Sequence, residues 1–247
     1  MKRQLSAGNA VLGQRLQDVS ATLESGQLTA ICGPNGAGKS TLLSALAGLE
    51  ALDSGQVLLD GRLLAELPPK ERAQRLGYLP QSGETAWDIA VRSVVALGRL
   101  PHGGLGDDTV DAALGELSLE TLADRPISTL SGGEKARALL ARVFAGEPEW
   151  ILADEPLAAL DLAHQLALIA SLKARAAGGA GVVIVLHDLA LAMNHADRVV
   201  VLDRGRVAAD GAPEEALSAR ILNDVWGVQG RWIGEEGARA LVVDPVV

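Results

Sequence analysis

The sequence of 247 residues contains little cysteine and few aromatic residues. Its only cysteine, Cys32, excludes an intramolecular disulfide and favours a reducing compartment, the cytoplasm being the simplest. One Tyr, one Phe and four Trp leave a core built from Ala, Leu and Val. The length predicts one domain, or one domain with a small insertion, which is large enough to bury a core without disulfides or metal ions.

Long apolar runs and clusters of basic residues are also missing. The most apolar stretch, residues 181–193, is interrupted by His187 and Asp188 and is shorter than the ~20 residues that a transmembrane helix needs. The first ten residues, MKRQLSAGNA, contain no apolar run of the kind found in signal peptides. A net charge of −9 without a basic cluster argues against duplex nucleic acid as a partner.

Short aliphatic runs alternate with helical patterns, which predicts an α/β domain with a parallel sheet. We expect strands at residues 27–32, 56–59, 76–79, 150–154, 181–187 and 199–203, the last followed by a turn at 204–205. We expect helices at residues 39–47, 132–145 and 161–176, and a short one that begins at residues 68–69. Helical patterns at 88–97 and 108–117 predict an inserted helical subdomain, and the tail from Glu214 predicts a helix and then a hairpin over 231–243.

Residues 33–40 (GPNGAGKS) fit the pattern G-x-x-x-x-G-K-[ST] between a predicted strand and a predicted helix. Glycines let successive amides point at an anion, and the helix that follows adds its N-terminal dipole. Lys39 would reach the β- and γ-phosphates, Ser40 would hold Mg²⁺ and Thr41 would contact the α-phosphate. A glycine-rich turn with an exposed lysine is the alternative. The predicted nucleotide site comprises Gly33, Pro34, Asn35, Gly36, Ala37, Gly38, Lys39, Ser40 and Thr41.

Two acids end the apolar run that begins at Trp150. The ends of parallel strands meet at the edge where α/β folds bind ligands. Asp154 is placed there to hold Mg²⁺, and Glu155 to polarise a water for in-line attack on the γ-phosphate. Taken alone, the pair is equally consistent with a strand capped by acids before Pro156.

A second helix is expected to begin at residues 130–134 (LSGGE). The side chain of Ser131 and the amides of Gly132 and Gly133 are suited to binding a phosphate. Taken alone, an ordinary N-cap by Ser131 is the simpler explanation. One nucleotide does not need two such sites in one chain, unless each site serves a nucleotide held by a second copy.

These motifs, in this order, resemble those of the ABC transporter ATPases over nearly the whole chain. Residues 33–40 are similar to the Walker A loop, Gln81 to the Q-loop and residues 130–134 to the signature motif. Residues 151–155 are similar to the Walker B motif, residues 158–161 to the D-loop and His187 to the H-loop. The resemblance implies a RecA-like P-loop NTPase core (residues 1–81 and 136–213) with an antiparallel β subdomain. It also implies an inserted α-helical subdomain (82–135) and a C-terminal extension (214–247).

The resemblance further implies that two copies pair head-to-tail and sandwich two ATP molecules. Each ATP would lie between the Lys39 loop of one copy and the signature segment of the other. Gln81 would contact the metal ion and the attacking water, and His187 the γ-phosphate. The expected catalytic residues are then Glu155, His187 and Gln81, and the expected Mg²⁺ ligands are Ser40, Gln81 and Asp154. Ser131, Gly132, Gly133, Glu134 and Asp161 complete the expected nucleotide site.

Two positions depart from the family pattern. The family usually has an aromatic side chain upstream of the Walker A loop that stacks on adenine, but no aromatic residue occurs here before Tyr78. The matching stretch offers only Val11, Leu12 and Arg15, so we expect weaker base stacking and a looser nucleotide preference. Ala158 stands in the D-loop where serine is common, so the hydroxyl contact that a serine makes across the dimer is not expected.

The segment after Gln81 indicates the kind of ABC protein. It is too short for the coiled-coil insertion of chromosome-maintenance relatives, and one cassette excludes tandem translation factors. Residues 86–91, 94–102 and 152–166 are similar to the ATPases of siderophore, haem and cobalamin (type II) importers. For Arg99, Pro101 and His102 the alternative is a helix-ending turn with solvated side chains.

In those importers the segment after the Q-loop helps to form a groove for a cytoplasmic helix of the permease. Trp87 is the candidate contact in this groove, and a core tryptophan is the alternative. The implied reaction is hydrolysis of ATP, with Mg²⁺ as cofactor, coupled to inward transport of a metal chelate. The transported molecule does not contact this subunit, so the sequence does not distinguish iron–siderophore, haem and cobalamin.

The implied partners are a second copy of the chain, integral permease subunits and, indirectly, a periplasmic substrate-binding protein. The implied location is peripheral, on the cytoplasmic face of the cell membrane. Three alternatives are a soluble ABC ATPase such as one for iron–sulphur cluster assembly, an exporter subunit, and a plain P-loop kinase or GTPase. A plain P-loop kinase or GTPase would lack the helix start at Ser131 and the distal His187. Co-purification with an integral membrane subunit would distinguish an importer subunit from a soluble ABC ATPase.

Overall fold

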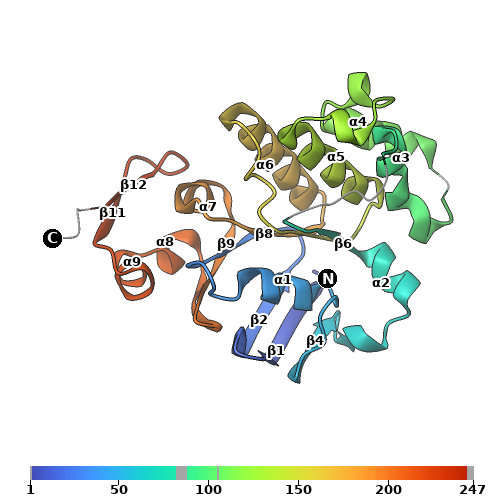
Figure 1. Cartoon of the computed structure of the whole chain (residues 1–247). Coiled ribbons are helices and arrows are strands. Elements are labelled where there is room, and N and C mark those ends of the chain that lie inside the picture. The colour runs from blue at the N-terminus through green and yellow to red at the C-terminus, as the bar shows by residue number, and fades with distance from the viewer. Residues whose placement is uncertain (1, 82–87, 105, 244–247) are drawn as a thin grey trace.

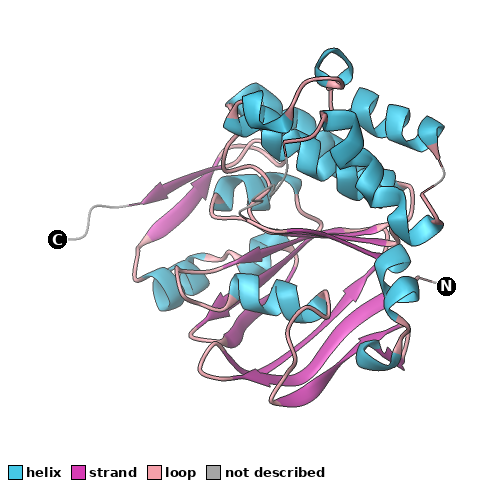
Figure 2. Ribbon diagram, turned by 45° about the vertical axis from the view of Figure 1, so that its right-hand side comes forward, coloured by secondary structure: helices cyan, strands magenta, loops and turns pink. Residues whose placement is uncertain are grey.

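A six-stranded sheet runs through the middle of the molecule, between a layer of helices and a second sheet (Figures 1 and 2). The structure is a computed structural model that describes residues 2–81, 88–104 and 106–243. The strand order is β10-β9-β3-β8-β7-β6, and all neighbours are parallel except β10 and β9, which form a hairpin. The strands are β3 (Leu28–Cys32), β6 (Leu76–Leu79), β7 (Trp150–Ala153), β8 (Gly181–Val185), β9 (Arg198–Asp203) and β10 (Arg206–Gly211).

The central strands are buried on both faces, as is usual for parallel strands between two layers. Side chains alternate across a strand, so β8 sends Val182 and Ile184 to one hydrophobic core and Val183 and Val185 to the other. The strands β3, β6, β7, β8 and β9 each contribute to both cores in this way. The prediction of an aliphatic interior is confirmed, although the two largest fully buried side chains are aromatic, those of Trp150 and Phe144.

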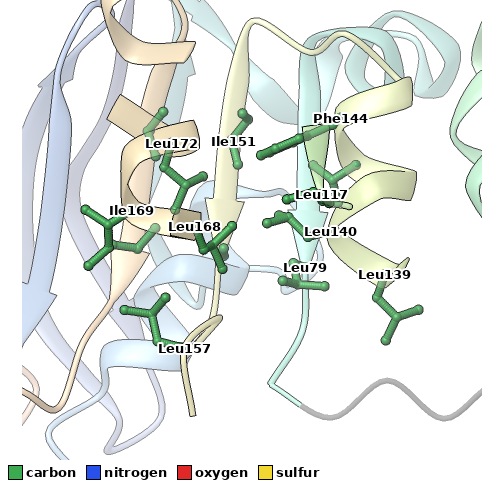
Figure 3. Packing of buried hydrophobic residues seen from close by; sticks show 14 of the residues in the cluster. Leu79, Leu117, Leu139, Leu140, Phe144, Ile151, Leu157, Leu168, Ile169 and Leu172 are labelled. Atoms are coloured by element: carbon green, nitrogen blue, oxygen red, sulfur yellow. The ribbon is translucent and has the colours of Figure 1, made fainter. Parts of the chain in front are cut away.

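Helices cover one face of this sheet (Figure 1). They are α3 (Val91–Ala96), α4 (Asp107–Glu116), α5 (Gly132–Ala145), α6 (Leu162–Ala177) and α7 (Leu189–His195), with short 3-10 turns η2 (Leu97–His102), η3 (Glu120–Leu122) and η4 (Ile127–Thr129). Leu140 and Phe144 of α5 and Leu168 and Leu172 of α6 flank Ile151 of β7 in Figure 3. This packing fixes α5 and α6 on the sheet.

A four-stranded antiparallel sheet lies on the other side, with α1 (Lys39–Leu46) between the two sheets (Figure 2). Its order is β2-β1-β4-β5. The remaining elements of this half are β1 (Gln4–Leu12), β2 (Leu16–Glu24), β4 (Ser54–Leu59), β5 (Arg62–Leu63), η1 (Leu64–Glu66) and α2 (Pro69–Arg75). The sequence pattern did not locate β1 and β2. In β1 a register shift between Ala7 and Ala10, where Asn9 has φ 49°, breaks the two-residue alternation.

Most predicted elements lie within one or two residues of the observed ones. The helix expected at 88–97 is wrong at its start, because α3 begins only at Val91. Ala90 forms a β-bridge with Pro126, and the amide of Ile127 donates to the carbonyl of Ile89 at 2.9 Å. This pairing holds the chain extended ahead of the helix. The expected subdomain boundary after residue 135 falls within α5.

The C-terminal segment contains α8 (Pro213–Ala216), α9 (Ala219–Trp226) and the hairpin of β11 (Gly230–Ile233) and β12 (Ala240–Val243). The predicted hairpin is therefore confirmed. Asn194 on α7 binds it by a reciprocal pair of hydrogen bonds with the backbone of Arg239, at 2.8 and 2.7 Å. Trp232 donates its indole N–H to the carbonyl of Leu217 at 2.8 Å. Among all described helices, none is long and apolar enough to cross a membrane.

Candidate nucleotide site

The glycine-rich loop lies between β3 and α1, and Gly38 is the N-cap of that helix. No side chain caps this helix N-terminus, so the amides of its first turn are available to an anion. Gly38 has φ 100°, and a Cβ there would come within 2.4 Å of the carbonyl oxygen of Arg15. At Gly33 a Cβ would lie 2.2 Å from the carbonyl oxygen of Leu202. At these two positions the loop packs against the turn before β2 and against strand β9 more closely than a side chain would allow.

Lys39 is buried, with 6% of its surface exposed. Its ammonium donates to the carbonyl oxygens of Gly33 at 2.8 Å and Pro34 at 3.0 Å. Burial lowers the pKa of Lys39, and the nearby carboxylates of Glu155 and Asp154 oppose this shift. A phosphate offers this desolvated ammonium a charged acceptor in place of neutral carbonyls.

Asp154 follows β7, is 4% exposed and forms a hydrogen bond with Ser40. Burial raises the pKa of Asp154, and the Ser40 contact lowers it less. Its Oδ1 is buried and finds no hydrogen-bond partner within the described residues. A buried carboxylate oxygen without a donor, beside a hydroxyl, fits a Mg²⁺ ion, which takes one or two protein oxygens and completes its shell with phosphates and water.

Glu155 and His187 lie at the ends of the neighbouring strands β7 and β8. His187 Nε2 donates to Glu155 Oε1 at 2.5 Å. The Glu155 side chain is 13% exposed, and its backbone has φ 50°, a value that few bulky residues adopt. Such backbone strain is typical of functional sites.

Lys39, Ser40, Glu155 and His187, but not Asp154, line a cavity of about 650 Å³. Its described lining consists of Arg15, Asn35, Gly36, Ala37, Gly38, Lys39, Ser40, Thr41, Gln81, Glu155 and His187. Four sequence motifs that lie far apart in the chain therefore meet in one cavity. Arg15 belongs to none of them, and its guanidinium forms an ion pair with Glu50 at 2.8 Å.

The signature segment lies at a second cavity of about 460 Å³. Its described lining consists of Ser131, Gly132, Gly133, Glu134, Arg137, Ala159, Leu160, Asp161 and His164. Ser131 and Glu134 form a capping box at the start of α5, so the N-cap alternative is what the structure contains. Asp161 is the N-cap of α6 and binds both the amide (2.9 Å) and the ring Nδ1 (2.8 Å) of His164.

The linings of the two cavities have no described residue in common. The predicted site residues thus fall into two groups, one around Lys39 and one around Ser131. Sequence reasoning did not single out Arg137 or His164 in the second cavity. His164 has a local signal, three residues after an N-cap acid, whereas Arg137 is an ordinary helix residue.

A model of the ABC transporter family matches residues 16–158, more than half of the chain. The chain belongs to the ABC transporter family. The hemin import ATP-binding protein HmuV of Rhodococcus jostii is 46% identical over 86% of this chain and 74% of its own length. An inward-facing metal-chelate type ABC transporter has a TM-score of 0.83 and 26% identity, covering 100% of this chain and 98% of that chain. An ATP-binding cassette in a dimeric post-hydrolysis state with ADP and phosphate has a TM-score of 0.77 and 26% identity, covering 85% and 98%.

As an ABC ATPase, the chain has a RecA-like P-loop core, so the expected fold class is confirmed. Cys32 is the last residue of β3 and directly precedes the Walker A loop. The thiol is buried in the core, and burial raises its pKa to about 12. Cys32 is therefore the inert apolar residue that its position predicts.

The stretch similar to importer ATPases ends in a turn that caps α5 of this ABC ATPase. Arg99 donates to the carbonyl of Ala145 at 3.0 Å, and His102 Nε2 lies 3.1 Å from the carbonyl oxygen of Gly146. The Arg99 side chain is 13% exposed, so the alternative of a solvated side chain is wrong for this residue. Helix C-termini need such donors, and α5 is the helix that begins at Ser131. Trp87 lies outside the described residues.

Proposed function

We propose that this chain is the ATPase subunit of an importer for hemin or a chemically similar metal chelate. The observation that carries the proposal is the 46% identity to a hemin import ATP-binding protein over 86% of the chain. The match to a metal-chelate type transporter along the whole chain supports the same substrate class. As the ATPase of an importer, the subunit would lie on the cytoplasmic face of the membrane, bound to permease subunits. A substrate-binding protein would deliver the substrate to those permease subunits.

In the proposed reaction, Lys39 holds the β- and γ-phosphates with the amides of the Walker A loop. Glu155 accepts a proton from the water that attacks the γ-phosphate, and His187 contacts the same phosphate. Ser40 and Asp154 would hold Mg²⁺ together with Gln81, and the ion would neutralise charge on the phosphate oxygens. The hydrogen bond from His187 keeps the Glu155 carboxylate at the open edge of the sheet.

We also propose that two copies pair head-to-tail, so that the signature cavity of one copy covers the nucleotide of the other. Support comes from the separation of the two cavities within one chain and from the dimeric form of the ADP-bound relative. In this arrangement the amides of Gly132 and Gly133 would complete the phosphate site from the opposite side. Residues 82–135 would form the helical subdomain that contacts the permease.

Reconstitution tests the importer function. The chain should co-purify with integral permease subunits, and proteoliposomes that also contain the substrate-binding protein should take up hemin in an ATP-dependent manner. Ferric siderophore and cobalamin serve as competing substrates in the same assay. Uptake of neither hemin nor another metal chelate, or purification without any membrane subunit, would refute the proposal.

A mixing experiment tests the shared sites. Lys39→Ala and Ser131→Arg should each be inactive alone, because each damages both sites of its homodimer. In a random mixture, half of the dimers carry one intact site, so about a quarter of the wild-type ATPase rate should return. Phosphate release from the mixture measures this. A rate no higher than the sum of the two variants would place each site within one chain.

The missing aromatic residue predicts a loose choice of base. A site that reads a base by hydrogen bonds rejects analogues strongly, whereas stacking tolerates any base. We expect kcat/KM for ATP and GTP to agree within about tenfold, because no Phe, Tyr or Trp side chain is among the described lining residues of the cavity to stack on the base. Steady-state phosphate release with each nucleotide measures the ratio. A strong preference for ATP would contradict this expectation.

A further inference from the structure

Arg15 enters the nucleotide cavity from the antiparallel sheet. Among the described lining residues it is the only one outside the phosphate-binding and catalytic motifs. It lies in the turn that joins β1 and β2, whereas the other lining residues come from the first turn of α1 and from loops at the ends of strands of the six-stranded sheet. Arg15 therefore faces any ligand from a direction that the motifs do not cover.

Backbone contacts fix the position of this turn. The amide of Arg15 donates to Leu12 at 3.0 Å, and the amide of Gly13 donates to the Asp53 carboxylate at 2.7 Å. The carbonyl oxygen of Arg15 packs against Gly38, as described above, and also against Gly205, where a Cβ would lie 2.8 Å away. The turn, the Walker A loop and the β9–β10 hairpin thus meet at one point, and the Arg15 side chain begins at a fixed place beside the loop.

The guanidinium is held in a fork by Glu50, with Nη2–Oε2 at 2.8 Å and Nη1–Oε1 at 3.5 Å. The Arg15 side chain is nevertheless 57% exposed. The Glu50 carboxylate binds the edge of the guanidinium and does not itself cover the faces of the planar group. The pair is neutral as a whole, so Arg15 adds little positive charge for a phosphate. A planar guanidinium that is largely exposed and lines the cavity is suited to stacking on a flat ring.

We propose that Arg15 is the base-binding residue of this site, stacking its guanidinium on the nucleobase, and that Glu50 is the positioning residue that holds it. The inference rests on the proposed nucleotide site. The Walker A loop binds the phosphates, and the ring stacks on Arg15 at the antiparallel-sheet side. The contact uses the π-face that all bases share and so discriminates weakly between them.

Binding of three ligands separates this role from a phosphate contact. ADP, GDP and inorganic tripolyphosphate are titrated with Mg²⁺ into wild type and Arg15→Ala by calorimetry. We expect Arg15→Ala to weaken the binding of ADP and GDP by roughly 2- to 30-fold and to leave the affinity for tripolyphosphate unchanged. An equal loss of affinity for tripolyphosphate would show that Arg15 contacts the phosphates. No loss of affinity for ADP would show that Arg15 does not contact the nucleotide. Either result overturns the inference.

Further variants test the stacking and the role of Glu50. Arg15→Trp should restore ADP binding, whereas Arg15→Lys, which keeps the charge but not the plane, should behave like Arg15→Ala. Glu50→Gln should raise KM for ATP without changing kcat. If Arg15→Lys binds ADP like wild type and Arg15→Trp does not, the result would contradict stacking.

Two controls keep the test interpretable. Arg62→Ala removes an arginine of similar exposure (58%) that is paired with Glu71 and does not line the cavity. This variant should bind all three ligands with wild-type affinity. Thermal unfolding of each variant checks the fold. If wild type binds neither ADP nor tripolyphosphate, the proposed nucleotide site itself is refuted, which is a different result from a failure at Arg15.

Discussion

Replacing Glu155 with glutamine is expected to lower ATP turnover by about a hundredfold or more and to leave ATP binding intact. Glutamine has the same shape and can keep a hydrogen bond with His187, but it cannot accept the proton of the attacking water. The side chain is 13% exposed and contacts His187 at 2.5 Å, so the substitution changes the chemistry with little change in packing.

Phosphate release and ATP-dependent dimerisation measure the two halves of this prediction. Glu155→Gln should hydrolyse ATP very slowly and accumulate as an ATP-bound dimer in gel filtration. Glu236→Gln, in the exposed turn of the C-terminal hairpin, is the matched control and should behave as wild type. Normal hydrolysis by Glu155→Gln would overturn the assignment of the general base.

Lys39→Ala is expected to weaken ATP binding by roughly 10- to 100-fold, because a hydrogen bond to a charged group contributes about 1.5–3 kcal/mol. The fold should tolerate the change. The ammonium donates to two loop carbonyls, but burial lowers its pKa, so its removal also relieves the cost of a desolvated charge. We expect the free energy of unfolding to change by less than about 1 kcal/mol.

Calorimetric titration with ATP and urea unfolding measure these two quantities. Lys173→Ala, on the exposed face of α6, is the control for loss of a lysine charge. Wild-type affinity in Lys39→Ala would show that the loop amides bind the phosphates without the lysine. A large loss of stability together with lost binding would instead show that the lysine mainly holds the loop.

Local patterns were sufficient for the elements that carry the motifs. The strand before the Walker A loop, the loop and α1 are contiguous, so one short segment contains the aliphatic run, the glycines and the lysine. The same holds for β7 with Asp154 and Glu155, and for α5, whose predicted bounds are those observed. Where the pairing partner is distant, the pattern failed, as in β1 with its bulge and in the extended residues before α3.

The candidate site was predictable as a set of residues but not as an arrangement. The sequence indicated Lys39, Glu155, His187 and Gln81 as members of one site, and the structure places all four on one cavity. It did not indicate that Glu155 and His187 are hydrogen-bonded, nor that Glu155 has a strained backbone. Such contacts depend on the register of neighbouring strands, which no single segment encodes.

The scarcity of aromatic residues in this chain has its main consequence at the nucleotide site. By itself, the sequence determined the α/β class, the phosphate-binding chemistry and the absence of an aromatic residue near the Walker A loop, because each depends on residue types along one segment. Only the tertiary structure decided that Arg15 lines the nucleotide cavity and that the signature segment lines a separate cavity. The physical reason is close backbone approach, since Gly38 and Gly205 let turns distant in the sequence meet around the Arg15 carbonyl.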